Sequence, residues 1–307
     1  MPQGLLVAAF PPRLTVTADE PEFNAALVQT PGLLDARDLG MHWQSASVGI
    51  ELRELRGCEM GIERGRTYHL VRYQAGAGEK LTMAATSGVE VALWSRQRAA
   101  YADALPDYQE KANEMAHRAV AEFQAYFLLA AGHDLINMTA RMLAFDESLR
   151  PLLREKLKTD FPSNSTDRND YIAINKYAAK DLRKIARQSV RFAFDAIVAP
   201  VYALALDADW NAMVEQRGSD FHRVRPQSHG GVGASAQDPW SEGDGVVSMD
   251  IGSFANYSEA EGMAEKVTAL NLAAMKSLTA ACSDFDRALD EFFNATRVAL
   301  PVVDEGH

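Results

Sequence analysis

The sequence predicts an α+β protein that is mostly α, with a small β-rich N-terminal region followed by a helical bundle. Two observations indicate this class. Residues 1–97 contain short alternating runs separated by Gly and Pro, whereas residues 98–307 contain long segments rich in Ala, Leu, Glu and Met. A chain of 307 residues is long enough for one large domain or two ordinary ones. We therefore expect a β-rich region over 1–97 and a helical region over 98–307.

The strand prediction for the first region depends on five short runs. Alternating or β-branched residues in such runs favour strands, and Gly and Pro residues lie between them, as in GAGEK at 76–80. No residues in this region indicate a chemistry, so its expected role is that of a sensor or a docking surface for a protein partner. The five runs are 14–17, 48–52, 68–73, 80–83 and 89–91.

The helices of the second region are predicted from composition and apolar spacing. Residues 108–144 contain no proline and one glycine, which favours a single long helix. The Gly-, Ser- and Asp-rich stretch 229–258 is expected to be a long loop, a candidate flap over a site. Further helices are expected over 146–158, 168–198, 205–216 and 258–298.

Segment 168–198 has the most regular amphipathic pattern in the chain, with apolar side chains on one arc and six cations on the opposite arc. The chain has 42 acidic and 31 basic residues and a net charge of -11, so a basic stripe is unexpected and favours an anionic partner. A solvated face that pairs with neighbouring acidic side chains is the other interpretation. The stripe consists of Lys176, Lys180, Arg183, Lys184, Arg187 and Arg191.

A second concentration of cations is the stretch RGSDFHRVRPQS at 217–228. Arg217 and His222 are separated by four residues, and Arg223 and Arg225 follow. A histidine that titrates near neutral pH suits proton transfer at a ribose hydroxyl, and an arginine suits stabilisation of a phosphate. The pair therefore predicts a catalytic site for RNA, with Arg223, Arg225 and the stripe as phosphate-binding residues. A spacing that arose by chance is the alternative.

The Arg217-x4-His222 motif, at the end of a helix in an all-helical region, resembles the Arg-x4-6-His motif of the HEPN superfamily. The resemblance implies a helical bundle over residues 98–307 and a metal-independent endoribonuclease of a toxin or defence system. It also implies a homodimer, in which two motifs face each other across a cleft. Family members commonly have a polar residue after the arginine, where this chain has Gly218. An inactive HEPN-like module that binds RNA, a nucleotide or a protein, and a helical scaffold, remain alternative interpretations.

Composition and motif searches exclude several other classes. Two distant cysteines argue against a disulfide framework and predict a reducing, cytoplasmic compartment. The sequence contains no stretch of about 18 uncharged apolar residues, so no membrane span is expected. We expect neither a metal nor a cofactor, because no HExxH, CxxC or Walker pattern is present. His133 and Asp134 are interpreted as a locally bonded structural pair.

Overall fold

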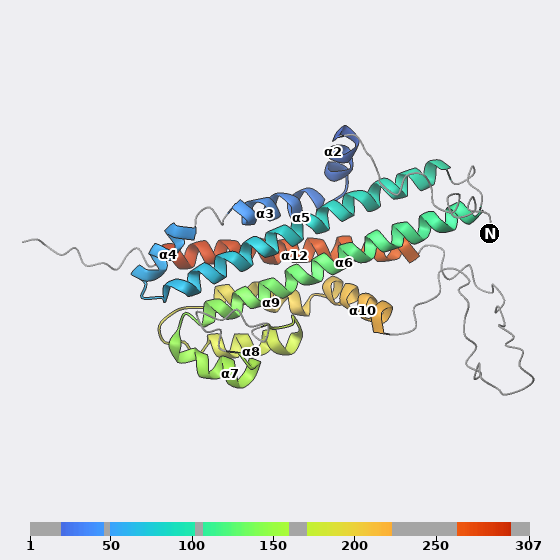
Figure 1. Cartoon of the computed structure of the whole chain (residues 1–307). Coiled ribbons are helices and arrows are strands. Elements are labelled where there is room, and N and C mark those ends of the chain that lie inside the picture. Colours follow the sequence, from blue (N-terminus) through green and yellow to red (C-terminus); the bar gives the residue numbers. More distant parts are fainter. Residues whose placement is uncertain (1–19, 46–49, 102–106, 160–170, 223–262, 296–307) are drawn as a thin grey trace, which may run out of the picture.

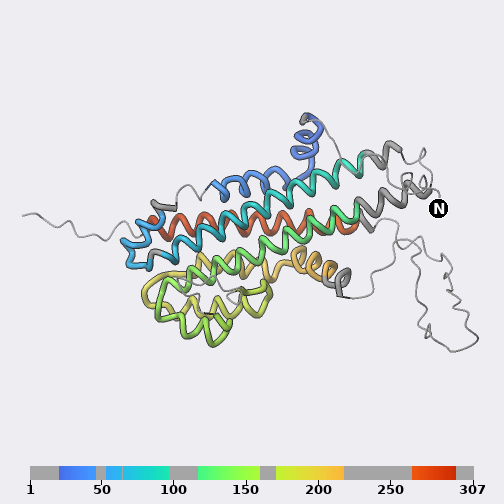
Figure 2. Tube along the Cα trace, in the orientation of Figure 1, coloured from blue at the N-terminus to red at the C-terminus, as the bar shows by residue number. Residues whose placement is uncertain are grey.

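The computed structural model describes residues 20–45, 50–101, 107–159, 171–222 and 263–295, and these form helices and turns without any strand. Figure 1 shows an elongated bundle built on three long helices. Two of them, α5 (Arg64–Tyr101) and α6 (Asp107–Leu143), are consecutive in the chain and pack against each other. The third, α12 (Met263–Ala295), lies beside helices from the first half of the chain, as the trace in Figure 2 shows.

Shorter helices cover the long ones on two sides. On one side, three helices from the start of the chain pack mainly on α5. They are α2 (Glu20–Gln29), α3 (Leu33–Ser45) and α4 (Ile50–Glu59). On the other side, α9 (Asp195–Leu206) and α10 (Ala208–His222) pack on α12 and α6. A lobe at one end of the bundle contains the 3-10 turn η2 (Glu147–Leu149), α7 (Arg150–Leu157) and α8 (Lys176–Ala186).

A continuous apolar core joins these layers. Trp43 of α3, Trp210 of α10 and Phe285 of α12 are fully buried in it, together with leucines and alanines from α5 and α6. Burial of each large side chain contributes on the order of 2 kcal/mol, so helices distant in sequence stabilise one another through this core. Among the described residues, no helix has an apolar stretch long enough to cross a membrane.

The predicted β-rich N-terminal region is wrong. Three of the five runs expected to be strands, 68–73, 80–83 and 89–91, lie inside the single helix α5. The run 48–52 overlaps the start of α4, and the run 14–17 lies outside the described residues. The predicted boundary at residue 97 also falls within α5.

Close helix packing explains why the GAGEK stretch is helical. A Cβ atom on Gly78 would lie 2.5 Å from the carbonyl oxygen of Gly40, so the missing side chains let α3 and α5 touch through their backbones. The Thr82 hydroxyl donates a hydrogen bond to the Gly78 carbonyl one turn earlier in α5, so the hydroxyl has a hydrogen-bond partner within the helix. Glycine and threonine therefore serve helix contact here, although their types favour turns and strands in isolation.

The later helices are predicted better, with one exception. The helix expected over 108–144 is confirmed by α6, and the one expected over 258–298 by α12. The single helix expected over 168–198 is wrong, because residues 171–175 are extended and a turn separates α8 from α9. The loop expected over 229–258 lies outside the described residues.

A side chain of α6 and a cap at the start of α8 explain this interruption. The side chain of Asn137 forms both hydrogen bonds that a neighbouring strand would offer to Ile172, at 2.9 Å to its N–H and 2.8 Å to its carbonyl. The Asn175 side chain then accepts from the N–H groups of Tyr177 and Ala178 and caps α8. The helix cannot begin earlier, because the backbone at 172 is bonded to α6.

The α3–α5 contact gives a matched pair of substitutions. We expect Gly78→Ala to lower the free energy of unfolding by about 2 kcal/mol, because the added Cβ meets backbone. Gly76→Ala, two residues earlier, should raise it by up to about 1 kcal/mol, because its Cβ meets only Asp134 Oδ2 at 3.9 Å and alanine favours helices. Urea unfolding of both variants measures this, and equal effects would contradict the backbone contact.

Candidate functional site

The packing of α10 places Arg217 against the middle of α6. The Trp210 ring fills a notch in α6 where a Cβ on Gly132 would lie 2.5 Å from it, and Met213 is buried one turn later. At the start of the helix, the Asp207 carboxylate accepts a hydrogen bond from the backbone N–H of Trp210. Trp210 and Met213 therefore hold this helix in the core. Arg217 follows Met213 by four residues and therefore also faces α6.

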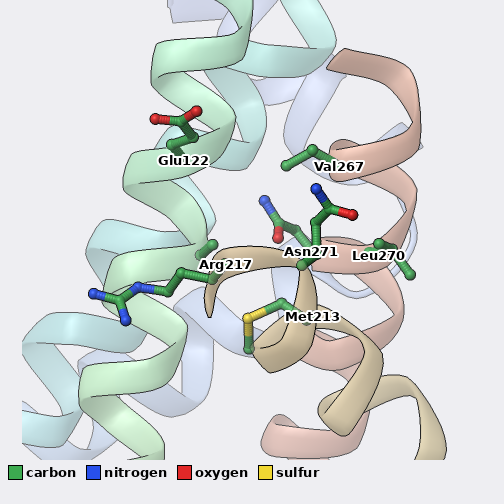
Figure 3. Close-up of a pocket in the computed structure, with 8 residues that line it drawn as sticks. Glu122, Met213, Arg217, Val267, Leu270 and Asn271 are labelled. Atoms are coloured by element: carbon green, nitrogen blue, oxygen red, sulfur yellow. The ribbon is translucent and has the colours of Figure 1, made fainter. Parts of the chain in front are cut away.

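The Arg217 side chain runs from α10 across α6, away from Val267 and Asn271 of α12, as Figure 3 shows. Its guanidinium carbon lies 5.9 Å from the centre of the Tyr126 ring on α6. The small cavity beside it has a volume of about 10 Å³, which is room for about one water molecule. Arg217 thus lies against the side of α6 and borders only a small cavity.

The partners predicted for Arg217 are not described. The backbone of His222 lies at the last residue of α10, but its side chain lies outside the described part of the structure. Arg223 and Arg225 lie outside the described residues altogether. The predicted pairing of Arg217 with His222 therefore stays a prediction.

The structure instead brings Arg217 close to a group of polar and aromatic side chains on α5, α6 and the extended segment before α8. We call this group the tyrosine–histidine cluster. Its members contact one another in pairs: Lys80 with Asp134, His133 with Tyr171, and Arg217 with Tyr126. The cluster consists of Lys80, Tyr126, His133, Asp134, Tyr171 and Arg217.

A backbone hydrogen bond fixes the orientation of His133. The N–H of Ile174 donates to His133 Nδ1 at 2.9 Å. Because Nδ1 accepts, the neutral ring carries its proton on Nε2. The His133 ring also meets the Tyr171 ring edge to face, with ring centres 5.4 Å apart. His133 therefore presents one N–H donor beside an aromatic ring.

Burial, together with the charges of Arg217 and Lys80, lowers the pKa of His133 to about 4. At neutral pH the ring is therefore uncharged. A histidine with this pKa donates a hydrogen bond from Nε2 but is a poor proton donor in catalysis at neutral pH. The structural role expected for His133 is supported, although its partner is Ile174 and not Asp134.

Two further members of the cluster, Asp134 and Tyr171, have raised pKa values. The buried Asp134 carboxylate accepts a hydrogen bond from Lys80 Nζ; burial raises the pKa of Asp134, and Lys80 partly offsets this. Burial, with Asp134 and the Tyr126 and Tyr73 hydroxyls, raises the pKa of Tyr171 to about 12. Tyr171 therefore keeps its proton, and its side chain is 48% exposed. Sequence analysis missed the Lys80–Asp134 pair because Lys80 was expected in a strand.

The predicted basic stripe is divided by the structure. Lys176, Lys180, Arg183 and Lys184 are exposed on one side of α8, and Arg187 follows in the turn after it. We call these five residues the α8 basic face. Arg191, in contrast, donates to the Met60 carbonyl at 2.6 Å and lies over the Phe192 ring, so it joins the lobe to the α4–α5 turn.

Contacts within the α8 basic face are few and weak. Lys184 lies 3.8 Å from Asp181 and Arg187 lies 4.0 Å from Asp195, both at the surface. Arg183 lies over the Tyr202 ring at 4.5 Å. Such exposed pairs contribute at most about 1 kcal/mol and leave the cations accessible.

The surrounding lobe is also basic. Residues 147–195, which contain the lobe, have eleven Lys and Arg against seven Asp and Glu, in a chain with a net charge of -11. In the part of the chain that the structure describes, no group of three or more His, Cys, Asp or Glu side chains is placed to hold a metal ion. The lobe is thus a concentration of positive charge suited to an anion.

Comparisons with known proteins give no relative from which a function could be transferred. No family model matches the chain, and neither a curated protein nor a solved structure shows significant similarity to it.

The lowered pKa of His133 predicts a pH dependence of stability. A histidine with a folded-state pKa near 4 and an ordinary value of 6.5 binds fewer protons when folded. Its contribution is therefore complete above pH 6.5 and is lost as the pH falls toward 4, by up to about 3 kcal/mol. His133→Gln keeps a hydrogen-bond acceptor without titrating, so its unfolding free energy should fall less steeply over this window. Parallel curves for the two proteins in urea unfolding would contradict the assignment.

Proposed function

We propose that the protein binds RNA through the α8 basic face. The observation that carries this proposal is the placement of five exposed cations along α8 and the turn after it, in an acidic chain. Like charges on neighbouring turns repel one another, so such a face costs stability unless an anion neutralises it. A phosphate backbone supplies regularly spaced negative charges, and binding releases its counterions.

Exposed aromatic side chains beside the cations favour an unpaired strand as the ligand. Tyr177 is 69% exposed on α8, and the Lys176 ammonium lies 5.2 Å from the centre of its ring. Proteins that bind single-stranded nucleic acid combine a basic surface with rings on which bases stack. Tyr177 and Lys180 lie three residues apart, so they share one side of the helix.

Cleavage of the bound RNA is the finer form of this proposal. Here Arg217 stabilises charge on the scissile phosphate and His222 transfers protons, as the resemblance to the HEPN superfamily implies. The position of Arg217 beside Tyr126, on a surface of α6 and not in the core, supports a role in contact with a ligand. Two such sites would meet in a homodimer.

Charge reversal on α8 tests RNA binding. We expect Lys180→Glu with Lys184→Glu to weaken binding of a fluorescent single-stranded RNA at least tenfold, because two phosphate contacts become repulsive. The salt dependence of log Kd should also become shallower by about 2, one for each lost contact. Fluorescence anisotropy at several salt concentrations measures both quantities.

The matched control reverses the same charge elsewhere. Lys276→Glu with Arg287→Glu changes two exposed cations on α12, outside the basic lobe. This variant should bind nearly as the wild type does. Equal weakening by both pairs would show a general charge effect, and binding of an acidic protein but not of RNA would favour the scaffold interpretation.

Cleavage is tested with purified protein in the presence of EDTA. We expect the wild type to cleave RNA, and Arg217→Ala and His222→Ala each to lose at least about a hundredfold in rate. His42→Ala, an exposed histidine on α3, and Arg287→Ala are matched controls that should retain the rate. If no protein cleaves total cellular RNA, catalysis is rejected and the α8 binding proposal stands by itself.

A further inference from the structure

The tyrosine–histidine cluster is connected to the α8 basic face by an exposed edge of the chain. Residues 171–175 are extended, with Ile172 and Ile174 buried against α6 and the alternate residues Tyr171, Ala173 and Asn175 exposed. Tyr171 and Lys176 are five residues apart along the chain, a distance of at most about 18 Å. A short single strand lying on α8 therefore reaches Tyr171 if it continues past the start of the helix.

The cluster offers three kinds of contact at that point. The half-exposed Tyr171 ring provides an aromatic surface, with its other edge supported by His133. Lys80, which also donates to Asp134, and Arg217, which lies against the Tyr126 ring, provide two cationic side chains. His133 Nε2 provides an N–H donor with a fixed tautomer, since Ile174 occupies Nδ1.

We propose that the tyrosine–histidine cluster binds one unpaired nucleotide, with its base stacked on Tyr171 and its phosphate between Lys80 and Arg217. This inference rests on the proposed binding of RNA to the α8 basic face and names where the bound strand continues. The half-exposed Tyr126 ring, whose centre lies 5.9 Å from the Arg217 guanidinium carbon, adds a second aromatic surface next to this cation.

The combination of groups distinguishes a nucleotide from simpler ligands. An inorganic anion would use the cations but leave the tyrosine rings exposed, and an apolar peptide would cover the rings but make no use of the Lys80, Arg217 and His133 donors. A nucleotide meets both requirements with one ligand, because it joins a flat base to a phosphate. A base within a duplex is covered by its neighbours and cannot stack on Tyr171, so the cluster selects single strands.

The fold does not depend on the Tyr171 side chain, which makes it a clean target for substitution. The extended segment is held through the backbone of Ile172 and Ile174, bonded to Asn137 and His133. Tyr171→Ala should therefore leave α8 and its cations in place. Tyr171→Phe keeps the ring and removes only the hydroxyl.

The experiment uses the full chain and a single-stranded RNA that carries one fluorescent purine analogue, with a duplex of the same sequence as comparison. We expect Tyr171→Ala to weaken single-strand binding about tenfold and to abolish quenching of the analogue, because one stacking contact is lost. Tyr171→Phe should keep both. Tyr68→Ala, an exposed tyrosine on α5 about 18 Å along the helix from Lys80, is the matched control.

The outcomes separate this inference from the function on which it rests. If Tyr171→Ala binds and quenches as the wild type does, while reversal of Lys180 and Lys184 weakens binding, the cluster site is rejected and the α8 proposal stands. If the wild type itself does not bind RNA, both are rejected. If Tyr171→Ala weakens duplex and single strand equally, the ring has no stacking role and the inference fails.

Discussion

The hydrogen bonds between α6 and the extended segment at 171–175 are the constraint on which the candidate sites depend. Asn137 holds Ile172 by both of its backbone groups, and His133 accepts from Ile174. These bonds set where α8 begins, and hence which way its cations face. The same bonds hold Tyr171 beside the histidine ring and fix the proton of His133 on Nε2. One buried amide and one imidazole thus position both sites.

Charge is distributed unevenly around this constraint. Residues 147–195, which contain the α7–α8 lobe, have an excess of four positive charges, so the rest of a chain with net charge -11 carries a formal charge of -15. An acidic body repels a phosphate backbone and a basic lobe attracts it, which restricts a polyanion to one end of the molecule. Arg217 and Lys80 extend positive charge from this end along α6, toward the middle of the bundle.

The sequence predicted the helices that are long and rich in good helix formers, and it failed where tertiary contact overrides local preference. For α5, Gly78, whose type favours a turn, is the position where α3 touches its backbone, which no single-chain pattern reveals. Arg217 and the α8 cations were found because charge on one helix face is visible in sequence. His133, Lys80 and Tyr171 were not grouped, because they come from three segments that meet only in the fold.

Binding and cleavage depend on different residues of this surface. With a pKa lowered to about 4, His133 is uncharged at neutral pH and is a poor proton donor there. It can still orient a phosphate through Nε2–H. In the proposed function, proton transfer is assigned to His222, whereas binding is assigned to α8 and the tyrosine–histidine cluster. A variant that lacks His222 is therefore expected to lose cleavage and to retain its affinity for RNA.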